Sequence, residues 1–259
     1  MKTDSLAING GHKVRSTPMP KRSVIEDEEY QSLTDFLETA KKSGKGVGYN
    51  GPKETQYTER FCDYMGGGYA DAVCSGTNAL FVALGSLDID PFSEIIVAPW
   101  TDPGGVMPVV FSACIPMMSD SHPGSFNMSA EEIEKMITPR TKAVIVSHIG
   151  GEAVDMPPVM ELAKKHGLKV IEDCAQSFGA TCRGSMIGTF GDVAIFSTMY
   201  TKHLSSGGQG GLVFTRDSDM FWEIKRYADR GKAFNLPTLD GREHAPLDCD
   251  VNEMAGNVR

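Results

Sequence analysis

Apolar runs typical of buried strands alternate along most of the chain with longer segments of helical periodicity. We expect strands near residues 70–74, 94–98, 115–119, 142–147, 169–173, 192–196 and 211–215. We expect helices near 26–42, 53–65, 77–87, 129–137, 156–167 and 217–230. Strands separated by helices favour an α/β fold in which a mostly parallel sheet carries helices on both faces, an α/β/α arrangement. The 259 residues, 41% of them hydrophobic, suffice for a sizeable core.

One lysine stands between a predicted strand and a glycine-rich turn. Lys202 follows the strand near 192–196, and four glycines lie within residues 207–211. We expect the amine of Lys202 to point into a cavity, where a partly desolvated lysine can act as a nucleophile. Most lysines at strand ends simply extend to water, so this interpretation depends on the neighbouring motifs.

A carboxylate and an amide lie at the end of another predicted strand, in KVIEDCAQSFGA (169–180). In open α/β sheets the carboxyl ends of the strands are where ligands bind. Pyridoxal phosphate requires a lysine that forms an imine and a carboxylate beside the pyridine nitrogen. Lys202 and Asp173 would supply these two groups, and Gln176 could hydrogen-bond the ring hydroxyl.

A turn of small residues, Ser75 to Asn78, precedes a predicted helix. Free N–H groups at a helix start favour an anion, so this turn could bind a phosphate. Ser75 or Thr77 could equally be a simple helix cap. Ser197, five residues before Lys202, is a second hydroxyl candidate for the same phosphate.

The segment from about residue 47 to 216 resembles the DegT/DnrJ/EryC1/StrS family of pyridoxal-phosphate-dependent sugar aminotransferases, which have fold type I. The motifs that carry the resemblance include SGTNAL (75–80), KVIEDCAQSFGA (169–180) and TKHLSSGGQGG (201–211). Their order and spacing agree with the family almost throughout. The resemblance implies that the chain contains the large domain of a fold type I enzyme and binds pyridoxal 5′-phosphate.

The resemblance also implies a role for individual residues. Lys202 would be the Schiff-base lysine and Asp173 the pyridinium partner, and both would be catalytic. The remaining expected cofactor contacts are Gln176 at the ring hydroxyl and Gly76, Thr77 and Ser197 at the phosphate. The family places an aromatic residue on the cofactor ring shortly after the strand near 94–98. Aligned with gaps, that position falls on Asp102, and we expect Trp100, two residues earlier, to stack on the ring.

The expected activity is transfer of an amino group from an amino acid, with glutamate as the expected donor, to a keto-sugar or a keto-cyclitol. The keto-sugar would be nucleotide-linked, and the expected assembly is a homodimer. Two alternatives stay open: a regulatory protein that binds pyridoxal phosphate without efficient turnover, and a sugar dehydratase. A histidine replaces the Schiff-base lysine in the dehydratase branch of the family, whereas Lys202 is retained here beside His203. Retention of the lysine favours transamination.

The expected domain organisation has three parts. Residues 1–25 would form an N-terminal arm and 26–245 the cofactor-binding large domain. Residues 246–259 would open a C-terminal small domain, because VNEMAGN (251–257) resembles the segment that begins it in this family. We therefore expect either a fragment of a longer protein or a short form that binds cofactor and turns over poorly.

The composition of the chain argues against several other classes of function. A net charge of −9 argues against binding to nucleic acid. The six cysteines form no CxxC pair, which suits reduced thiols in a cytoplasmic protein, and the six histidines show no metal-ligand spacing. No apolar run approaches the length of a membrane span, so no membrane partner is expected. His148 follows a predicted strand and is equally consistent with a place near the cofactor and with a structural role.

Overall fold

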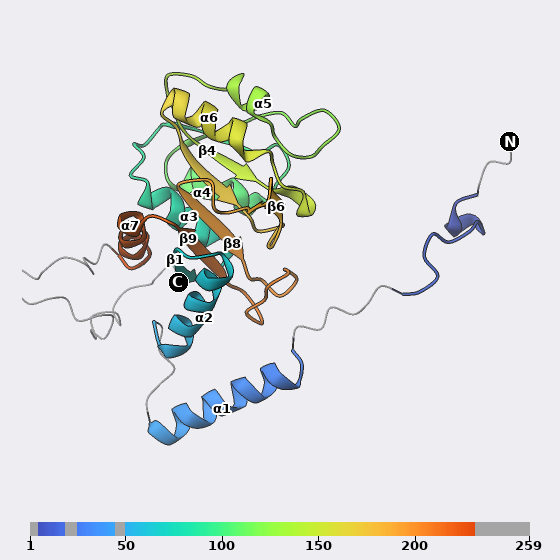
Figure 1. The fold of residues 1–259 in the computed structure, drawn as a ribbon, viewed down its shortest axis with the longest axis vertical. Coiled ribbons are helices and arrows are strands. Elements are labelled where there is room, and N and C mark those ends of the chain that lie inside the picture. The colour runs from blue at the N-terminus through green and yellow to red at the C-terminus, as the bar shows by residue number, and fades with distance from the viewer. Residues whose placement is uncertain (1–4, 19–24, 45–49, 231–259) are drawn as a thin grey trace, which may run out of the picture.

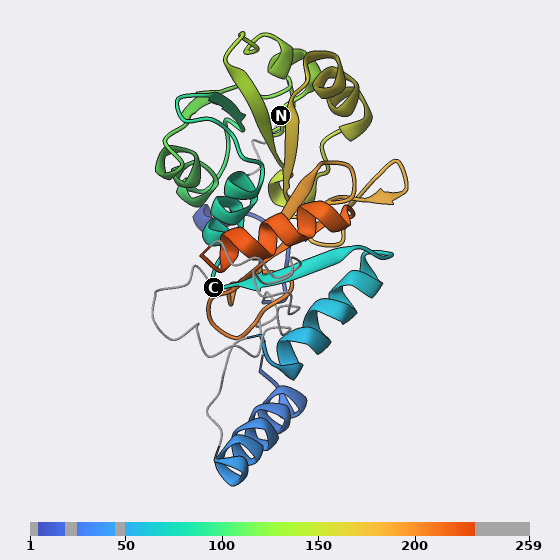
Figure 2. The same ribbon diagram turned by 90° about the vertical axis from the view of Figure 1, so that its left-hand side faces the viewer.

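The computed structural model describes residues 5–18, 25–44 and 50–230 of the chain. The expected small-domain segment, 246–259, lies outside these residues, as does the end of the expected large domain, 231–245. Within the described residues, one sheet is covered by helices on both faces (Figure 1 and Figure 2). This arrangement confirms the predicted α/β/α fold.

Seven strands form the sheet, in the order β1-β9-β8-β5-β4-β2-β3. Their bounds are β1 Tyr69–Val73, β2 Glu94–Val97, β3 Ile115–Met118, β4 Thr141–Ser147, β5 Lys169–Asp173, β8 Val193–Ser197 and β9 Gly211–Thr215. The strands from β8 to β3 run parallel, whereas β9 is antiparallel to both β8 and β1. Each strand lies within one residue of its predicted limits, because each is a short apolar run bounded by polar residues or glycine.

Alternate side chains of the central strands face opposite sides of the sheet. Ile96 and Val144 belong to one buried apolar cluster, whereas Ile95 and Ile145 belong to the other. Helices α2 (Pro52–Tyr64), α5 (Ala130–Glu134) and α6 (Met156–His166) contribute to the first cluster. Helices α3 (Gly76–Ser86), α4 (Met107–Phe111) and α7 (Ser218–Ala228) contribute to the second. The core therefore consists of two apolar layers separated by the sheet.

Two of the small elements that the sequence did not predict are a short helix and a hairpin. One is α4, whose five residues are too few to show a helical period. The other is a hairpin of two short strands, β6 (Thr181–Cys182) and β7 (Ser185–Met186). Its turn holds Arg183 and Gly184, both with positive φ, so the hairpin depends on a local backbone conformation more than on an apolar pattern.

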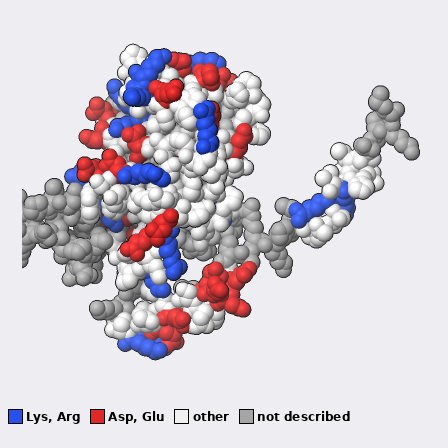
Figure 3. Space-filling view, viewed as in Figure 1, with Lys and Arg blue, Asp and Glu red and all other residues white. Residues whose placement is uncertain are grey.

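The N-terminal part of the chain lies away from the sheet (Figure 1). In the expected arm, residues 5–18 contain one 3-10 turn, Ala7–Asn9, and no buried residue. Helix α1 (Asp27–Ser43) follows, stands apart from the sheet and its helices in both ribbon views, and buries none of its residues. Acidic residues occupy its first turn and Lys41 and Lys42 its last, which suits the helix dipole, and Figure 3 shows the acidic end as a red patch.

None of the helices in the described ranges combines the length and the apolar character needed to cross a membrane. The five cysteines in the same ranges are free thiols, and three of them are buried. Cys249 lies outside the described residues.

Candidate functional site

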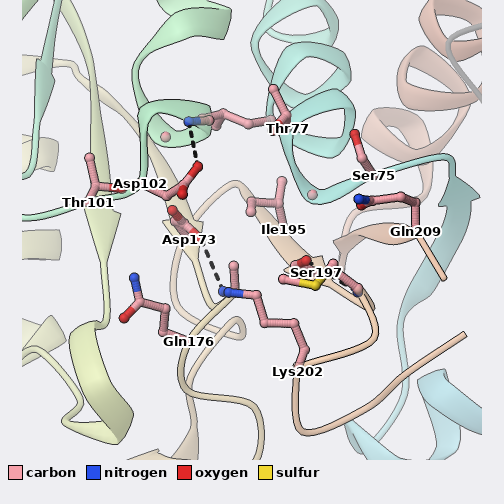
Figure 4. Close-up of a pocket in the computed structure, with 16 residues that line it drawn as sticks. Ser75, Thr77, Thr101, Asp102, Asp173, Gln176, Ile195, Ser197, Lys202 and Gln209 are labelled. Carbon is pink, nitrogen blue, oxygen red and sulfur yellow. Dashed lines mark hydrogen bonds between the residues drawn. The ribbon is translucent and has the colours of Figure 1, made fainter. Parts of the chain in front are cut away.

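A pocket of about 260 Å³ lies at the edge of the sheet where the parallel strands end (Figure 4). Because these strands run in one direction, the segments that follow β2, β5 and β8 meet at this edge. The turn before α3 completes the wall. Six of the seven residues predicted from the sequence line the pocket: Gly76, Thr77, Asp173, Gln176, Ser197 and Lys202.

The turn between β1 and α3 presents the start of a helix to the pocket. Ser75 is the N-cap of α3, and its hydroxyl accepts a hydrogen bond from the N–H of Asn78 at 3.1 Å. The first N–H groups of a helix have no partners within it, and the positive end of the helix dipole lies there. Ser75, Gly76 and Thr77 all line the pocket, so this turn can hold an anionic group. The helix cap and the candidate anion site are thus features of the same turn.

This turn packs directly against the ends of two strands. A Cβ atom on Gly76 would lie 2.8 Å from the Cβ of Ser197, at the end of β8. A Cβ atom on Gly211, at the start of β9, would lie 2.5 Å from the carbonyl oxygen of Ser75. Both separations are shorter than any normal contact, so only glycine allows the three backbone segments to approach this closely. The position of the turn is therefore fixed by the sheet.

Asp173 ends β5, and its residue is 8% exposed. One carboxylate oxygen accepts a hydrogen bond from the N–H of Ala175 at 3.0 Å, and the other accepts one from the hydroxyl of Ser147 at 3.2 Å. Burial raises the pKa of Asp173 above its ordinary value, although these two hydrogen bonds act in the opposite direction. A positively charged group that entered the pocket beside Asp173 would favour its charged form.

Lys202 lies in the loop between β8 and β9. Its backbone N–H donates to the carbonyl oxygen of Met199 at 2.8 Å, and its side chain lines the pocket. Figure 4 shows the side chains of Lys202 and Asp173 directed toward the same part of the pocket. The positive charge of Lys202 lowers the pKa of Asp173, although less than burial raises it. The prediction that the lysine points into a cavity is confirmed.

Gln176 and Ser197 contribute polar atoms to two other parts of the pocket wall. The side-chain oxygen of Gln176 accepts a hydrogen bond from the N–H of Gly150 at 3.3 Å. Ser197, the last residue of β8, lies against Gly76 of the turn before α3. Both side chains line the pocket, as their predicted roles require.

The structure places Trp100 apart from the predicted site. Its side chain is 55% exposed and packs edge-on against Phe126, with ring centroids 5.1 Å apart. The next residues, Thr101 and Asp102, line the pocket instead. Asp102 caps the 3-10 turn Pro103–Gly105 by accepting a hydrogen bond from the N–H of Gly104 at 2.9 Å. This turn, which the sequence analysis did not anticipate, determines which side chains face the cavity.

His148 has a structural environment and does not line the pocket. The N–H of Val154 donates to its Nδ1 at 3.1 Å, so Nε2 carries the proton and donates to the buried carboxylate of Glu172, 3.3 Å away. The same carboxylate accepts three backbone N–H groups at 2.7 Å: those of Gly188, Phe190 and Gly191. His148, Glu172 and Cys174 have metal-type ligand atoms close together. Hydrogen bonds already occupy those of His148 and Glu172, so the cluster acts as a structural anchor for β5.

Several pocket residues were not predicted as site residues, among them Thr101, Asp102, Ala175 and Met199. The sequence TDPGG (101–105) does carry a turn signal, because an aspartate before proline and glycine favours a capped turn. Ala175 and Met199 have no chemical signature of their own. They line the pocket because their neighbours Asp173 and Lys202 do.

The chain is similar to known proteins in sequence and in fold. Residues 25–237 match the DegT/DnrJ/EryC1/StrS aminotransferase family. GDP-perosamine synthase of Caulobacter vibrioides is 38% identical over 176 residues, which are 68% of this chain and 47% of that protein. The solved aminotransferase from Psychrobacter cryohalolentis is 32% identical, with a TM-score of 0.80 over 93% of this chain and 59% of that one. NtdA of Bacillus subtilis, solved with bound cofactor PMP, is 25% identical, with a TM-score of 0.76 over 90% of this chain and 53% of that one.

The chain spans about half the length of the curated relatives it matches. The range matched by the family contains every residue that lines the pocket. It also contains the whole of the described sheet. The chain belongs to the DegT/DnrJ/EryC1/StrS aminotransferase family.

Proposed function

We propose that this chain binds pyridoxal 5′-phosphate and that the protein transfers an amino group from an amino acid to a keto-sugar or keto-cyclitol. Glutamate is the proposed donor, and the keto-sugar is nucleotide-linked. The observation that carries the proposal is that Lys202 and Asp173 line one pocket together with the anion-binding turn before α3. The relatives support it, because one is named for a GDP-linked amino sugar and another was solved with PMP, the amine form of this cofactor.

The residues present fit this cofactor. Its phosphate suits the N-terminus of α3, where Gly76 and Thr77 lie at the pocket wall. Its ring nitrogen, when protonated, suits Asp173, because burial raises the pKa of this carboxyl and a positive charge beside it would favour the charged form. The amine of Lys202 lies in the same pocket. When bound, the cofactor supplies an aldehyde that condenses with an amine and a protonated ring that withdraws electrons.

The side chains of the pocket then have distinct roles. Lys202 would hold the cofactor through its amine, and its Nζ would be the base that removes a proton from the donor's Cα. Asp173 keeps a proton on the ring nitrogen. Gln176 would have its amide NH2 available for the ring hydroxyl, since its oxygen already accepts from the N–H of Gly150. Ser197 supplies a hydroxyl to the phosphate beside Gly76.

The proposal extends to organisation and location. Residues 26–245 form the large domain, 246–259 open a small domain, and 1–25 form an arm. The protein acts as a homodimer, which exposed apolar side chains on the short helix α4 support, namely Met107, Val110 and Phe111. A cytoplasmic location is supported by the five free cysteines of the described residues.

Absorption spectroscopy of the purified protein tests the proposal. Addition of pyridoxal phosphate should produce a visible band, and excess glutamate should bleach it. Once unbound cofactor has been removed, Lys202→Ala should lack the imine band, whereas Lys165→Ala, which changes an exposed lysine on α6, should leave that band unchanged.

Two other results would contradict parts of the proposal. A band that glutamate does not bleach would favour a regulatory protein that binds the cofactor without turnover. The absence of any band in the unmodified protein would refute the role of Lys202. Retention of the lysine disfavours the dehydratase alternative.

A further inference from the structure

The position of Lys202 depends on a loop. Strand β8 ends at Ser197 and β9 begins at Gly211, so residues 198–210 belong to neither strand. Lys202 lies near the middle of this segment, and it contributes to the pocket together with Gln209 near the end of the segment. Contacts that close the loop therefore decide where the amine of Lys202 lies.

Three backbone hydrogen bonds join the two halves of the loop. The N–H of Thr198 donates to the carbonyl of Gly210, and the N–H of Ser206 donates to the carbonyl of Thr198, each at 2.9 Å. The N–H of Tyr200 donates to the carbonyl of Gly208, also at 2.9 Å. These bonds bring Thr198 and Ser206 together on either side of the segment that carries Lys202.

The side chain of Ser206 strengthens this closure. Its Oγ lies 3.0 Å from Oγ1 of Thr198, 3.1 Å from the carbonyl oxygen of Thr198 and 3.1 Å from that of Gln209. A hydroxyl has one proton to donate and can accept another. Ser206 can therefore accept from the hydroxyl of Thr198 while it donates to one of the carbonyl oxygens. The resulting chain of hydrogen bonds links both ends of the loop.

Gly210 shows how closely these groups pack. A Cβ atom on Gly210 would lie 2.3 Å from Oγ of Ser206 and 2.4 Å from Oγ1 of Thr198. The two hydroxyls thus lie directly over the backbone of Gly210, where no other side chain fits. The bridge of hydroxyls has a defined place in the loop, next to the residue that precedes β9.

We propose that Ser206 is a positioning residue for Lys202: its hydroxyl, paired with that of Thr198, closes the loop so that the lysine amine is held in the pocket. Ser206 does not line the pocket and acts only through the loop. The inference rests on the proposed cofactor, because it concerns the lysine that would bond to it.

Binding of two forms of the cofactor separates positioning from general stability. Pyridoxal phosphate can bond covalently to Lys202, whereas pyridoxamine phosphate uses the same anion-binding turn and the same Asp173 without that bond. Ser206→Ala should weaken pyridoxal phosphate roughly fivefold, the change expected from losing one net hydrogen bond, and should leave pyridoxamine phosphate unchanged. Affinities are measured by absorbance and by fluorescence titration.

Three variants sharpen the test. Ser206→Thr keeps the hydroxyl and should restore the affinity for pyridoxal phosphate. Thr198→Val removes the other hydroxyl and should weaken it similarly, and the double variant should lose little more, because both changes break one bridge. Ser205→Ala is the matched control, since the hydroxyl of Ser205 accepts only a local bond from the N–H of Gly207 at 3.1 Å. It should leave both affinities unchanged.

Each result decides the matter. If Ser206→Ala changes neither affinity, or weakens both forms equally, the positioning role is refuted while the proposed cofactor stands. If the unmodified protein binds pyridoxal phosphate no more tightly than Lys202→Ala does, the proposed role of the lysine fails first, and the inference fails with it.

Discussion

Replacement of Gly211 by alanine should displace the turn Ser75–Asn78 before α3, which is the proposed phosphate site. A methyl group at this position would lie 2.5 Å from the carbonyl oxygen of Ser75 and 2.9 Å from the backbone N of Gly76. Normal contacts are about 3.5 Å, so the turn or β9 must move by roughly 1 Å. Gly211 has no positive φ, and alanine can adopt its backbone conformation without strain. The effect of the substitution is therefore steric.

The size of the effect on stability follows from overpacking, and the size of the effect on ligand affinity follows from displacement of the turn. Overpacking a close-packed site costs about 1–3 kcal/mol of unfolding free energy. For a domain of this size, that lowers the melting temperature by about 2–12 °C. A displacement of roughly 1 Å in the groups that hold a ligand can reduce catalysis by about a hundredfold. We therefore expect Gly211→Ala to weaken pyridoxamine phosphate binding by more than tenfold.

Gly208→Ala is the matched control for this experiment. Gly208 lies three residues before Gly211, in the loop that leads into β9; it has no positive φ, and a Cβ atom there would meet nothing within 4 Å. Both substitutions reduce the entropy of the unfolded chain to the same extent. The difference in melting temperature and in affinity between the two variants therefore reports the contact with Ser75. Calorimetry gives the melting temperatures and fluorescence titration the affinities. Equal melting temperatures and equal affinities for the two variants would refute the reasoning.

Three further predictions concern the surroundings of the site. The pKa of Glu94 is lowered, first by the hydroxyl of Thr138 and then by Arg140, so its stabilising effect exists at neutral pH and disappears as the pH falls through that pKa. Urea unfolding of Glu94→Gln should therefore differ from that of the unmodified protein near pH 7 and converge with it once the pH falls below the lowered pKa of Glu94; a constant difference would contradict this. Glu172→Gln should lower the unfolding free energy by about 1–3 kcal/mol, because an amide cannot accept all the N–H groups that the buried carboxylate holds; an unchanged urea midpoint would argue against that anchor. Trp100→Ala should change pyridoxal phosphate affinity less than twofold, because Trp100 is exposed and does not line the pocket. Loss of a ring stack would cost about 0.5–1.5 kcal/mol, so a tenfold loss of affinity would show that Trp100 does stack on the ring.

The strands and most of the pocket follow from local signals in the sequence. Each strand is a short apolar run, and in parallel strands that share an edge the residues just after them must come together. Asp173 at the end of β5 and Lys202 after β8 are therefore predictable from the order of the elements. The turn before α3 is predictable from a second local signal, because small polar residues such as Ser75 commonly cap the start of a helix.

Other features depend on backbone conformations that no periodicity encodes. Which of the consecutive residues Trp100, Thr101 and Asp102 faces the pocket is set by the 3-10 turn that Asp102 caps. The bridge between Thr198 and Ser206 joins residues eight positions apart through a loop without regular structure. Patterns of apolar residues indicate where such segments lie, but not which side chains they turn inward.

Covalent labelling of Lys202 tests the central claim most directly. The protein is incubated with pyridoxal phosphate, reduced with sodium borohydride so that the bond between aldehyde and amine becomes permanent, and mapped by peptide mass spectrometry. We expect the label on the peptide that contains Lys202, and its loss from that peptide in Lys202→Arg. A label spread over exposed lysines such as Lys164 and Lys165, and absent from Lys202, would contradict the account.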